Sequence, residues 1–237
     1  MAKLVFDIET TGLPPGHFDE VQQEYLFREA EKLPEEPARA ARRQEIERMF
    51  SLWPLTGTVV CIAMLNAESS RGQVLFLADD FEEAAEAGPV EFVACVDEVE
   101  LLTAFWDVAK HYEGIITFNG RGFDVPFIYM RSALLNVPIT RRDWLGYRFA
   151  TEPHCDLADQ FTFYNGTRDG ATRRFNLDFY CKAFGIESPK SEGVTGMDVS
   201  RLVQEGQFRQ VAEYCLRDVR ATVLLYHIWR ERLGGIK

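Results

Sequence analysis

Two carboxylates two residues apart, Asp7 and Glu9, stand in the opening stretch LVFDIETTGL. Their apolar and β-branched neighbours predict a strand, and side chains at positions i and i+2 of a strand point to the same side. The Thr-Thr-Gly sequence after Glu9 predicts that the strand leaves the sheet there. Two adjacent acids cannot be buried without partners or a metal ion. The pair is therefore either a solvated strand end or part of a metal site.

A third acid, Asp124, follows another expected strand, GIITFNG (residues 114–120). It stands near the start of FDVPFIYMRSALL (123–135), which predicts a helix with Pro126 in its first turn. An acid at this position can serve as the helix N-cap, as a metal ligand, or as both. The strand-to-helix junction is thus a second candidate for the same chemistry.

A tyrosine and a fourth acid, Tyr214 and Asp218, lie four residues apart in the stretch AEYCLRDV. Residues 207–233 predict a long amphipathic helix, so the two side chains share one face. The alternative is that Asp218 is a solvated acid paired with Arg217 or Arg220, while Tyr214 is an aromatic at the edge of the core. Taken alone, this helix favours that alternative.

The three elements occur in chain order as a strand-end D-x-E, a post-strand N-x-x-x-F-D and a late-helix Y-x-x-x-D. In this order they resemble the three exonuclease motifs of the DEDD superfamily of 3′→5′ exonucleases, in the form seen in proofreading domains of family B DNA polymerases. The histidine branch of the superfamily has His five residues before the final acid, where this chain has Glu213. The chain resembles the tyrosine branch (DEDDy), because Tyr214 lies four residues before Asp218. The resemblance extends from residue 4 to about residue 230.

The resemblance implies a ribonuclease H-like α/β fold and a stand-alone, metal-dependent 3′→5′ exonuclease. Such an enzyme hydrolyses phosphodiester bonds at the 3′ end of single-stranded nucleic acid and releases nucleoside 5′-monophosphates. DNA is the favoured substrate, because the motifs resemble those of polymerase proofreading domains. One alternative is an exoribonuclease with the same site, which contacts to the 2′-OH would distinguish. An alternative of another class is a non-catalytic nucleic-acid-binding or scaffold module, against which stands the presence of all four acids and the tyrosine.

By the same resemblance, the site holds two Mg²⁺ or Mn²⁺ ions, which prefer carboxylate oxygens. Asp7, Glu9 and Asp218 are expected to bind the ion that activates water. Asp7 is expected to bridge to the second ion, which Asp124 helps to place. Tyr214 is expected to orient the attacking water, since a tyrosine with its ordinary pKa near 10 is a poor base at neutral pH.

Binding of the 3′ end is expected to involve Leu13, Asn119 and Phe123. Leu13 lies where related proofreading domains place an apolar wedge against the terminal base, and the alternative is an ordinary loop residue. Asn119 and Phe123 match the second motif and are expected to contact the terminal nucleotide, although Phe123 can equally serve in packing. Three basic residues are candidates for phosphate contacts, with a solvated surface role favoured: Arg173, Arg174 and Lys190.

The elements that must position these residues form one expected domain over residues 1–237. Strands that alternate with helices, together with a hairpin over 57–66 and 72–78, predict a mixed and mostly five-stranded sheet flanked by helices. Residues 14–54 are charged and rich in helix formers, which predicts a helical insertion of two helices after the first strand. A further helix is expected after Asp97.

The net charge of −11 is concentrated in residues 79–100, which hold nine acids and no Lys or Arg, so the remainder carries −2. Residues 121–190 hold ten Lys or Arg and eight acids. This balance permits a polyanionic substrate but excludes tight non-specific coating of DNA, which needs many phosphate contacts. The acidic segment is expected to lie away from a nucleic-acid cleft.

Composition places the chain among ordinary folded proteins, with 46% hydrophobic and 13% aromatic residues among 237. No stretch approaches the length of a membrane span. Five scattered cysteines without a C-x-x-C pair argue against a disulfide framework or zinc site. They favour a reducing, cytoplasmic setting, and no membrane or protein partner is indicated.

Overall fold

A mixed sheet with strand order β4-β3-β2-β1-β5-β6 forms the centre of the protein in a computed structural model that describes residues 2–78, 88–188, 196 and 198–236. The strands are β1 (Lys3–Gly12), β2 (Gly57–Asn66), β3 (Gly72–Leu77), β4 (Val90–Cys95), β5 (Gly114–Thr117) and β6 (His154–Asp156). Strand β2 runs antiparallel to β1 and β3, while β5 is parallel to β1 and β6, and β4 is parallel to β3. The mixed α/β sheet expected from the sequence is confirmed, with six strands rather than the five anticipated.

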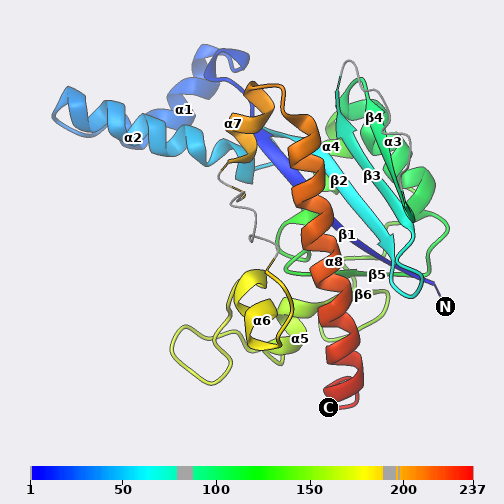
Figure 1. Ribbon diagram of the computed structural model, residues 1–237. Coiled ribbons are helices and arrows are strands. Elements are labelled where there is room, and N and C mark those ends of the chain that lie inside the picture. Colours follow the sequence, from blue (N-terminus) through cyan, green and yellow to red (C-terminus); the bar gives the residue numbers. More distant parts are fainter. Residues whose placement is uncertain (1, 79–87, 189–195, 197, 237) are drawn as a thin grey trace.

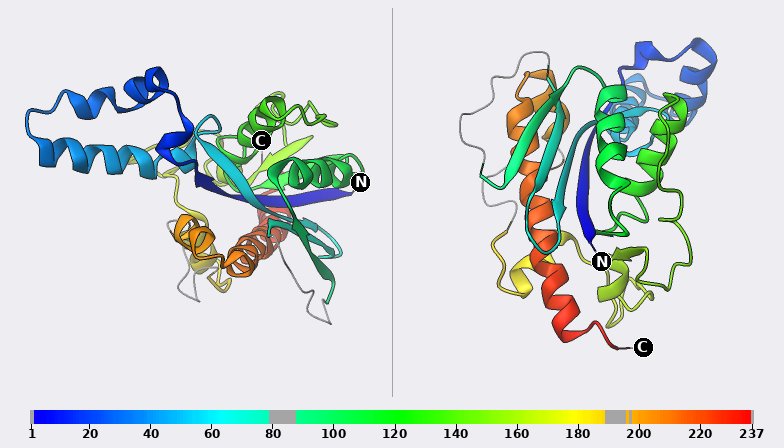
Figure 2. Two further views of the ribbon diagram at one scale, coloured as in Figure 1. Left: turned by 90° about the horizontal axis from the view of Figure 1, so that it is seen from above. Right: turned by 90° about the vertical axis from the view of Figure 1, so that its right-hand side faces the viewer.

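Helices cover both faces of this sheet (Figures 1 and 2). The α-helices are α1 (Glu20–Glu31), α2 (Glu36–Arg48), α3 (Glu98–Ala109), α4 (Asp124–Leu134), α5 (Leu157–Phe161), α6 (Leu177–Ala183), α7 (Val199–Gln204) and α8 (Phe208–Arg232), with short 3-10 helices η1 (Pro15–His17) and η2 (Phe50–Leu52). Helix α8 crosses one face, and α3 and α4 lie on the other (Figure 2). Two core clusters follow from this sandwich, one on each face.

Strand alternation decides which residues of β1 meet which helices. Val5 packs in the cluster that contains α8, whereas Phe6 and Ile8 pack in the cluster that contains α3 and α4. Because the side-chain period of a strand is two, Asp7 and Glu9 lie on the same face as Val5. The sheet therefore presents both carboxylates to the helix that carries the third motif.

The Thr-Thr-Gly sequence predicts that β1 leaves the sheet after Glu9. This prediction is wrong, because β1 continues in the sheet to Gly12. Its pairing with β2 shifts register between Glu9 and Thr10 and then continues to Gly12, opposite Gly57. A Cβ on Gly12 would lie 2.9 Å from Phe50 Cβ, and one on Gly57 would lie 2.8 Å from Phe50 O. The absence of side chains lets η2 close against this end of the two strands, where Thr10 Oγ1 also donates to the Ser51 carbonyl at 2.6 Å.

The expected helices of the 14–54 insertion are α1 and α2, which lie antiparallel and project away from the sheet (Figures 1 and 2). A small apolar cluster joins them to Phe18 and to η2, with Phe50 at 1% exposure as its most buried large side chain. Asp19 begins α1 with a capping box, since it accepts from Gln22 N while the Gln22 side chain accepts from Asp19 N. The insertion is thus anchored at the end of β1 that bears Glu9.

The acidic segment is described over residues 88–100, while residues 79–87 lie outside the described part of the chain. Its described portion forms β4 at one edge of the sheet and the start of α3. Asp97 accepts from Glu100 N and so caps α3, as expected. Two strands, β2 and β3, separate β4 from β1. This portion therefore lies away from the carboxylates of β1, in agreement with the expectation.

The five cysteines are all free and buried. Within the described residues, no helix is both long and apolar enough to cross a membrane.

A buried ion pair links the α3–α4 layer to β2. Glu98 and Arg131 are each 8% exposed and pair through two bonds, Nε to Oε1 at 2.9 Å and Nη2 to Oε2 at 2.6 Å. Glu98 Oε1 also accepts from Val59 N at 2.8 Å, and Arg131 Nη1 donates to the Pro54 carbonyl at 3.1 Å. Every member of the pair is satisfied, which a buried pair requires.

Removal of one partner should therefore be costly. Glu98→Ala leaves the Arg131 guanidinium buried and unpaired, and we expect the free energy of unfolding to fall by about 3 kcal/mol. The matched control is Glu45→Ala, which removes an exposed ion pair with Arg42 and should cost less than about 0.5 kcal/mol. Urea denaturation of both variants measures the difference, and equal losses would contradict the role assigned to the buried pair.

Candidate active site

The short length of β5 leaves one edge of β1 open where the first motif stands. Strand β5 pairs only with Lys3–Val5 of β1, so the strand beyond Val5 has no neighbour on that side in the sheet. On the other side, Asp7 lies opposite Ala63 and Glu9 opposite Cys61. Glu9 is 8% exposed and Asp7 is half-buried. Both carboxylates are therefore held on a strand at a point where other elements can approach.

Asp124 approaches this open edge from α4. Its Oδ1 accepts from Ile8 N of β1 at 3.2 Å, which occupies a donor that a longer β5 would have taken. The N-cap of α4 is Phe123, and Asp124 is the first helical residue. The alternative that Asp124 is the helix N-cap is therefore wrong, and its side chain contacts β1 instead. Burial is the main cause that raises the pKa of Asp124 to about 7.

Helix α8 brings Tyr214 and Asp218 to the same face of β1. The Tyr214 ring is buried and its hydroxyl shares a hydrogen bond with Asp218, one turn further along the helix. Between them, Cys215 Sγ donates to the backbone carbonyl of Asp7 at 3.4 Å. This contact and the apolar stripe of α8 hold the helix against the strand. Burial, followed by the charge of Asp218, raises the pKa of Tyr214, so its phenol is a hydrogen-bond donor at neutral pH.

The four carboxyl groups act on one another electrostatically. Burial raises the pKa of Asp7, and the charges of Asp124, Asp218 and Glu9 raise it further, in that order. Burial also raises the pKa of Glu9, followed by the charges of Asp218 and Asp124. The structure thus brings Asp7, Glu9, Asp124 and Asp218 close enough to act on one another electrostatically.

This cluster has the donor set that a hard divalent cation prefers. Among the described residues, ligand atoms of Asp7, Glu9 and Cys215 lie within 4.8 Å of one another. Burial raises the pKa of the Cys215 thiol well above its ordinary value, which keeps it protonated and makes it a poor ligand. Carboxylate oxygens are therefore the available metal ligands. Mg²⁺ and Mn²⁺ prefer such ligands, whereas softer metal ions prefer thiolates.

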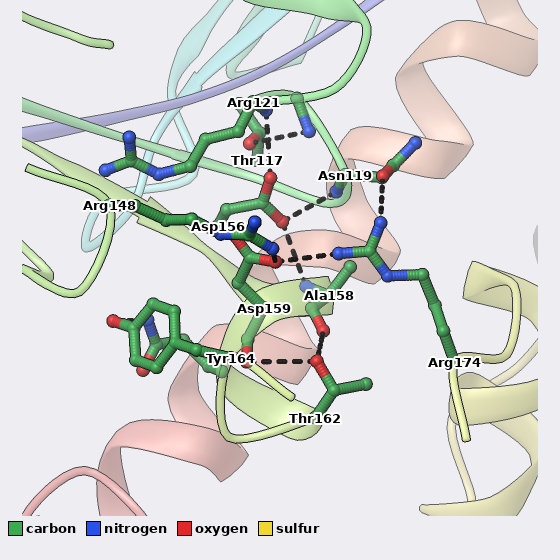
Figure 3. Close-up of polar contacts among 12 residues, drawn as sticks. Thr117, Asn119, Arg121, Arg148, Asp156, Ala158, Asp159, Thr162, Tyr164 and Arg174 are labelled. Carbon is green, nitrogen blue, oxygen red and sulfur yellow. Dashed lines mark hydrogen bonds and ion pairs between the residues drawn. The ribbon is translucent and has the colours of Figure 1, made fainter. Parts of the chain in front are cut away.

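The loop between β5 and α4 is held by a second acid that the sequence did not single out, Asp156. Its Oδ1 accepts from Asn119 N at 2.8 Å and its Oδ2 from Arg121 N at 2.9 Å (Figure 3). Oδ1 also accepts from Ala158 N at 3.0 Å. Asn119 has a φ of 68°, a left-handed conformation that Asn tolerates better than most residues. Asp156 therefore fixes the backbone of the second motif.

The Asn119 side chain is held by residues from a distant loop (Figure 3). Arg174 Nη1 donates to Asn119 Oδ1 at 2.8 Å, and Arg174 Nη2 donates to Asp159 Oδ1 at 2.7 Å. Asp159 is 2% exposed and also accepts from Arg148 Nη2 at 2.9 Å. The pair of acids in the stretch DLADQ was the available signal for Asp156 and Asp159. Arg174, expected on a solvated surface, instead has defined partners.

Three other residues that the sequence singled out have packing contacts within the protein. Leu13 is half-buried against the apolar cluster that anchors α1 and α2. Phe123 packs against the core on the α4 face, with its ring 5.4 Å from that of Phe127. Arg173 lies over the Phe175 ring at 5.0 Å. Lys190 falls outside the described residues.

His154 supports the loop that carries the second motif. Its Nδ1 lies 3.2 Å from the Trp144 carbonyl, an acceptor, so Nδ1 carries the proton and Nε2 accepts from Thr117 Oγ1 at 2.7 Å. Thr117 Oγ1 in turn accepts from Gly120 N at 3.2 Å. A Cβ on Gly120 would lie 2.4 Å from Thr117 Oγ1, so glycine is required for this contact.

The sequence of this chain can be compared with known protein families. Residues 56–235 match a family model described as a predicted 3′-5′ exonuclease related to the exonuclease domain of PolB. The matched range contains Asp124, Tyr214 and Asp218 and begins after Asp7 and Glu9. The first motif joins the matched part through β1, which pairs with β2 along its length.

Individual relatives are archaeal DNA polymerases. DNA polymerase 1 of Saccharolobus solfataricus is 25% identical over 177 residues, and DNA polymerase 1 of Sulfolobus acidocaldarius is 30% identical over 179 residues. Each alignment covers 70% of this chain and 19% of the polymerase, so the chain spans about a fifth of the length of these relatives.

Among solved structures, the family B DNA polymerase from the hyperthermophilic archaeon Pyrobaculum calidifontis is similar, with a TM-score of 0.55 and 21% identity. The similarity covers 96% of this chain and 24% of that polymerase. At this identity the likeness shows the fold alone. The resemblance and the fold class expected from the three motifs are confirmed.

Protonation of His154 should destabilise the fold as the pH falls. Burial, followed by the charge of Arg121, lowers the pKa of His154 to about 3, whereas the unfolded chain takes up the proton near 6.5. Between these values the unfolded state binds more protons. The His154 contribution to the free energy of unfolding is therefore constant above about pH 6.5 and falls by up to about 1.4 kcal/mol per pH unit below it.

Urea unfolding of the wild type and His154→Gln at about pH 7.5 and about pH 4.5 measures this contribution, because the site carboxylates titrate in both proteins. We expect the wild type to lose stability relative to the variant at the lower pH. A difference between the two proteins that does not change with pH would contradict the prediction.

Proposed function

Because this chain belongs to the family of predicted 3′-5′ exonucleases related to the exonuclease domain of PolB, we propose that it is a metal-dependent 3′→5′ exonuclease acting on single-stranded DNA. It hydrolyses the phosphodiester bond at the 3′ end and releases nucleoside 5′-monophosphates. The observation that carries the proposal is the cluster of Asp7, Glu9, Asp124 and Asp218, drawn from β1, α4 and α8, in which the charges of Asp124 and Asp218 raise the pKa values of Asp7 and Glu9. We propose that residues 1–237 act as one such domain. We also propose a reducing, cytoplasmic setting, which the five free cysteines support.

The four acids would hold two Mg²⁺ or Mn²⁺ ions. Such ions, when bound, lower the pKa of a coordinated water and neutralise charge at the phosphate. The raised carboxyl pKa values support this proposal, because a divalent cation would relieve the repulsion that raises them. Asp7 has carboxyl neighbours on three sides, from β1, α4 and α8, which fits a ligand shared between two ions.

Tyr214 is proposed to orient the attacking water. Its raised pKa keeps the phenol protonated, so it acts as a hydrogen-bond donor and not as the base. Its bond to Asp218 keeps the hydroxyl at the acid cluster. Burial of the ring fixes the direction of the hydroxyl, because a packed aromatic side chain loses its alternative rotamers.

The preference for DNA is supported by the relatives, which are DNA polymerases. An RNA-directed enzyme with the same site is the nearest competitor, and it requires contacts to the 2′-OH. A non-catalytic binding module is the competitor of another class. The retention of all four acids and of Tyr214 favours catalysis, since a binding role alone would not need a cluster of mutually repelling carboxylates over which a phosphate must pass.

Degradation of 5′-labelled single strands tests the proposal directly. With Mg²⁺ or Mn²⁺ the wild type should shorten the strand one nucleotide at a time, and chelator should stop it. Asp218→Asn should lower the rate by at least about a hundredfold, because it removes a charge that the ions require. Asp107→Asn, an exposed acid on α3, is the matched control and should retain wild-type activity.

DNA and RNA strands of the same sequence distinguish the competing substrates, and the faster one identifies the substrate class. Binding of either strand without shortening would favour the non-catalytic module. Equal activity in Asp218→Asn and the wild type would refute the assignment of the acid cluster.

Tyr214→Phe tests the orienting hydroxyl separately. Loss of one positioning hydrogen bond should lower kcat by roughly ten- to a hundredfold while KM changes less than about twofold. Tyr226→Phe, a buried tyrosine on the same helix, is the control and should leave kcat unchanged. Unaltered kcat in Tyr214→Phe would remove the hydroxyl from the reaction.

A further inference from the structure

The side-chain amide of Asn119 has a defined orientation. Its two ends look alike in shape, but a guanidinium donates hydrogen bonds and never accepts them. The atom 2.8 Å from Arg174 Nη1 is therefore the amide oxygen, Oδ1. The NH₂ group must then point away from Arg174, as Figure 3 shows. Arg174 thus decides which end of the amide faces outward.

Arg174 is itself held in place. Its second nitrogen, Nη2, bonds to Asp159 Oδ1 at 2.7 Å, so one planar guanidinium bridges Asp159 and Asn119. Asp159 is 2% exposed and cannot follow a moving side chain. The guanidinium fork is rigid, so a bond at one end fixes the other. Arg148 shares the same oxygen of Asp159 but makes no contact with Asn119 in the described structure.

The backbone of Asn119 is held independently, because its N–H donates to Asp156 Oδ1 at 2.8 Å. With the backbone and Oδ1 both occupied, the Nδ2 group of Asn119 remains, and it makes no hydrogen bond to any residue that the structure describes. Its two N–H groups are donors at the start of the loop that leads to Asp124. An acceptor on a bound molecule can complete them.

We propose that Arg174 is a positioning residue that fixes the Asn119 amide so that its NH₂ group donates to an acceptor atom on the sugar or base of the 3′-terminal nucleotide. The inference rests on the proposed exonuclease function. Arg174 acts through Asn119 and makes no direct contact with the reacting phosphate. Without Arg174, the side-chain amide of Asn119 can rotate. Binding of the terminal nucleotide is then weaker, because it must also fix the orientation of the amide.

Steady-state kinetics on a single-stranded DNA oligonucleotide compare Arg174→Ala with Arg148→Ala. Loss of one oriented hydrogen bond corresponds to a rise in KM of about three- to tenfold for Arg174→Ala, with kcat within about threefold of the wild type. Arg148→Ala removes the other ion pair of Asp159 but not the Asn119 contact, and its KM should stay within about twofold of the wild type. An equal rise in both variants would overturn the proposal, since loss of a positive charge or of support for Asp159 would then explain both.

Two further variants separate positioning from charge. Arg174→Lys keeps the charge, but its single ammonium group lacks the fork that bridges Asn119 and Asp159, so KM should rise nearly as far as in Arg174→Ala. In the double variant Asn119→Ala/Arg174→Ala, KM should rise no further than in Asn119→Ala alone, because Arg174 acts through Asn119. Wild-type KM in Arg174→Lys, or effects that multiply in the double variant, would overturn the proposal.

A binding measurement separates this inference from the proposed function. Fluorescence anisotropy of a labelled single strand in the inactive Asp218→Asn background, with Ca²⁺ present, should show a weaker Kd for Arg174→Ala by the same factor of about three to ten. A wild type that neither shortens nor binds the strand overturns both proposals. A wild type that shortens the strand, with Kd and KM unaffected by Arg174→Ala, overturns the positioning role alone. Thermal unfolding of each variant checks that the fold is retained.

Discussion

Mutual repulsion among buried carboxylates is the constraint on which the arrangement of this protein depends. Asp7, Glu9, Asp124 and Asp218 come from three elements and meet where little water can screen them. Each such contact opposes folding unless a proton or a cation intervenes. A divalent cation would relieve this repulsion by neutralising part of the charge.

The scaffold resists this repulsion with ordinary packing. Helix α8 is pressed against β1 by an apolar stripe and by the bond from Cys215 to the Asp7 carbonyl. Strand β5 stops short, and Asp124 takes the backbone donor of Ile8 that this leaves open. Two helices and a strand edge therefore meet at the place where the charges of their carboxylates oppose contact. Such local conflict within a consistent fold is typical of functional sites.

The nearby acids Asp156 and Asp159 are surrounded by hydrogen-bond donors and not by other carboxylates of the β1 cluster. Asp156 is surrounded by backbone N–H donors, and Asp159 by two arginines. These acids have protein partners that stabilise their charge, and they serve to shape the loop at Asn119. The acids of β1 have other carboxylates as neighbours. The two groups of acids thus differ in whether donors or other carboxylates surround them.

Much of this was readable from the sequence where the signal is local. The D-x-E spacing on a strand and the Y-x-x-x-D spacing on a helix each place two side chains together without tertiary information. The hairpin β2–β3 and helix α8 were likewise evident from their patterns. Only four strands of the expected sheet were assigned to residues, and β4 was not among them because its acidic surroundings hid a short apolar run. Strand β6 was missed because three residues form a strand only where β5 offers a parallel partner.

The contacts of Arg174 could not be read from the sequence for a different reason. Its partners lie 55 residues away at Asn119 and 15 residues away at Asp159, and no periodic pattern links them. The same holds for the contact of Asp124 with the backbone N–H of Ile8, 116 residues away. Contacts between polar groups far apart in the chain depend on the tertiary structure, so the local sequence around each residue does not predict them.

Binding of Mn²⁺ followed by electron paramagnetic resonance tests most directly whether the carboxylate cluster is a cation site. The measurement compares the wild type with the double variant Asp7→Asn/Asp218→Asn, whose fold is checked by circular dichroism. Saturable binding in the wild type that disappears in the folded variant is the predicted result. Absence of binding in the wild type, or equal binding in both proteins, would contradict the cation site and with it the proposed chemistry.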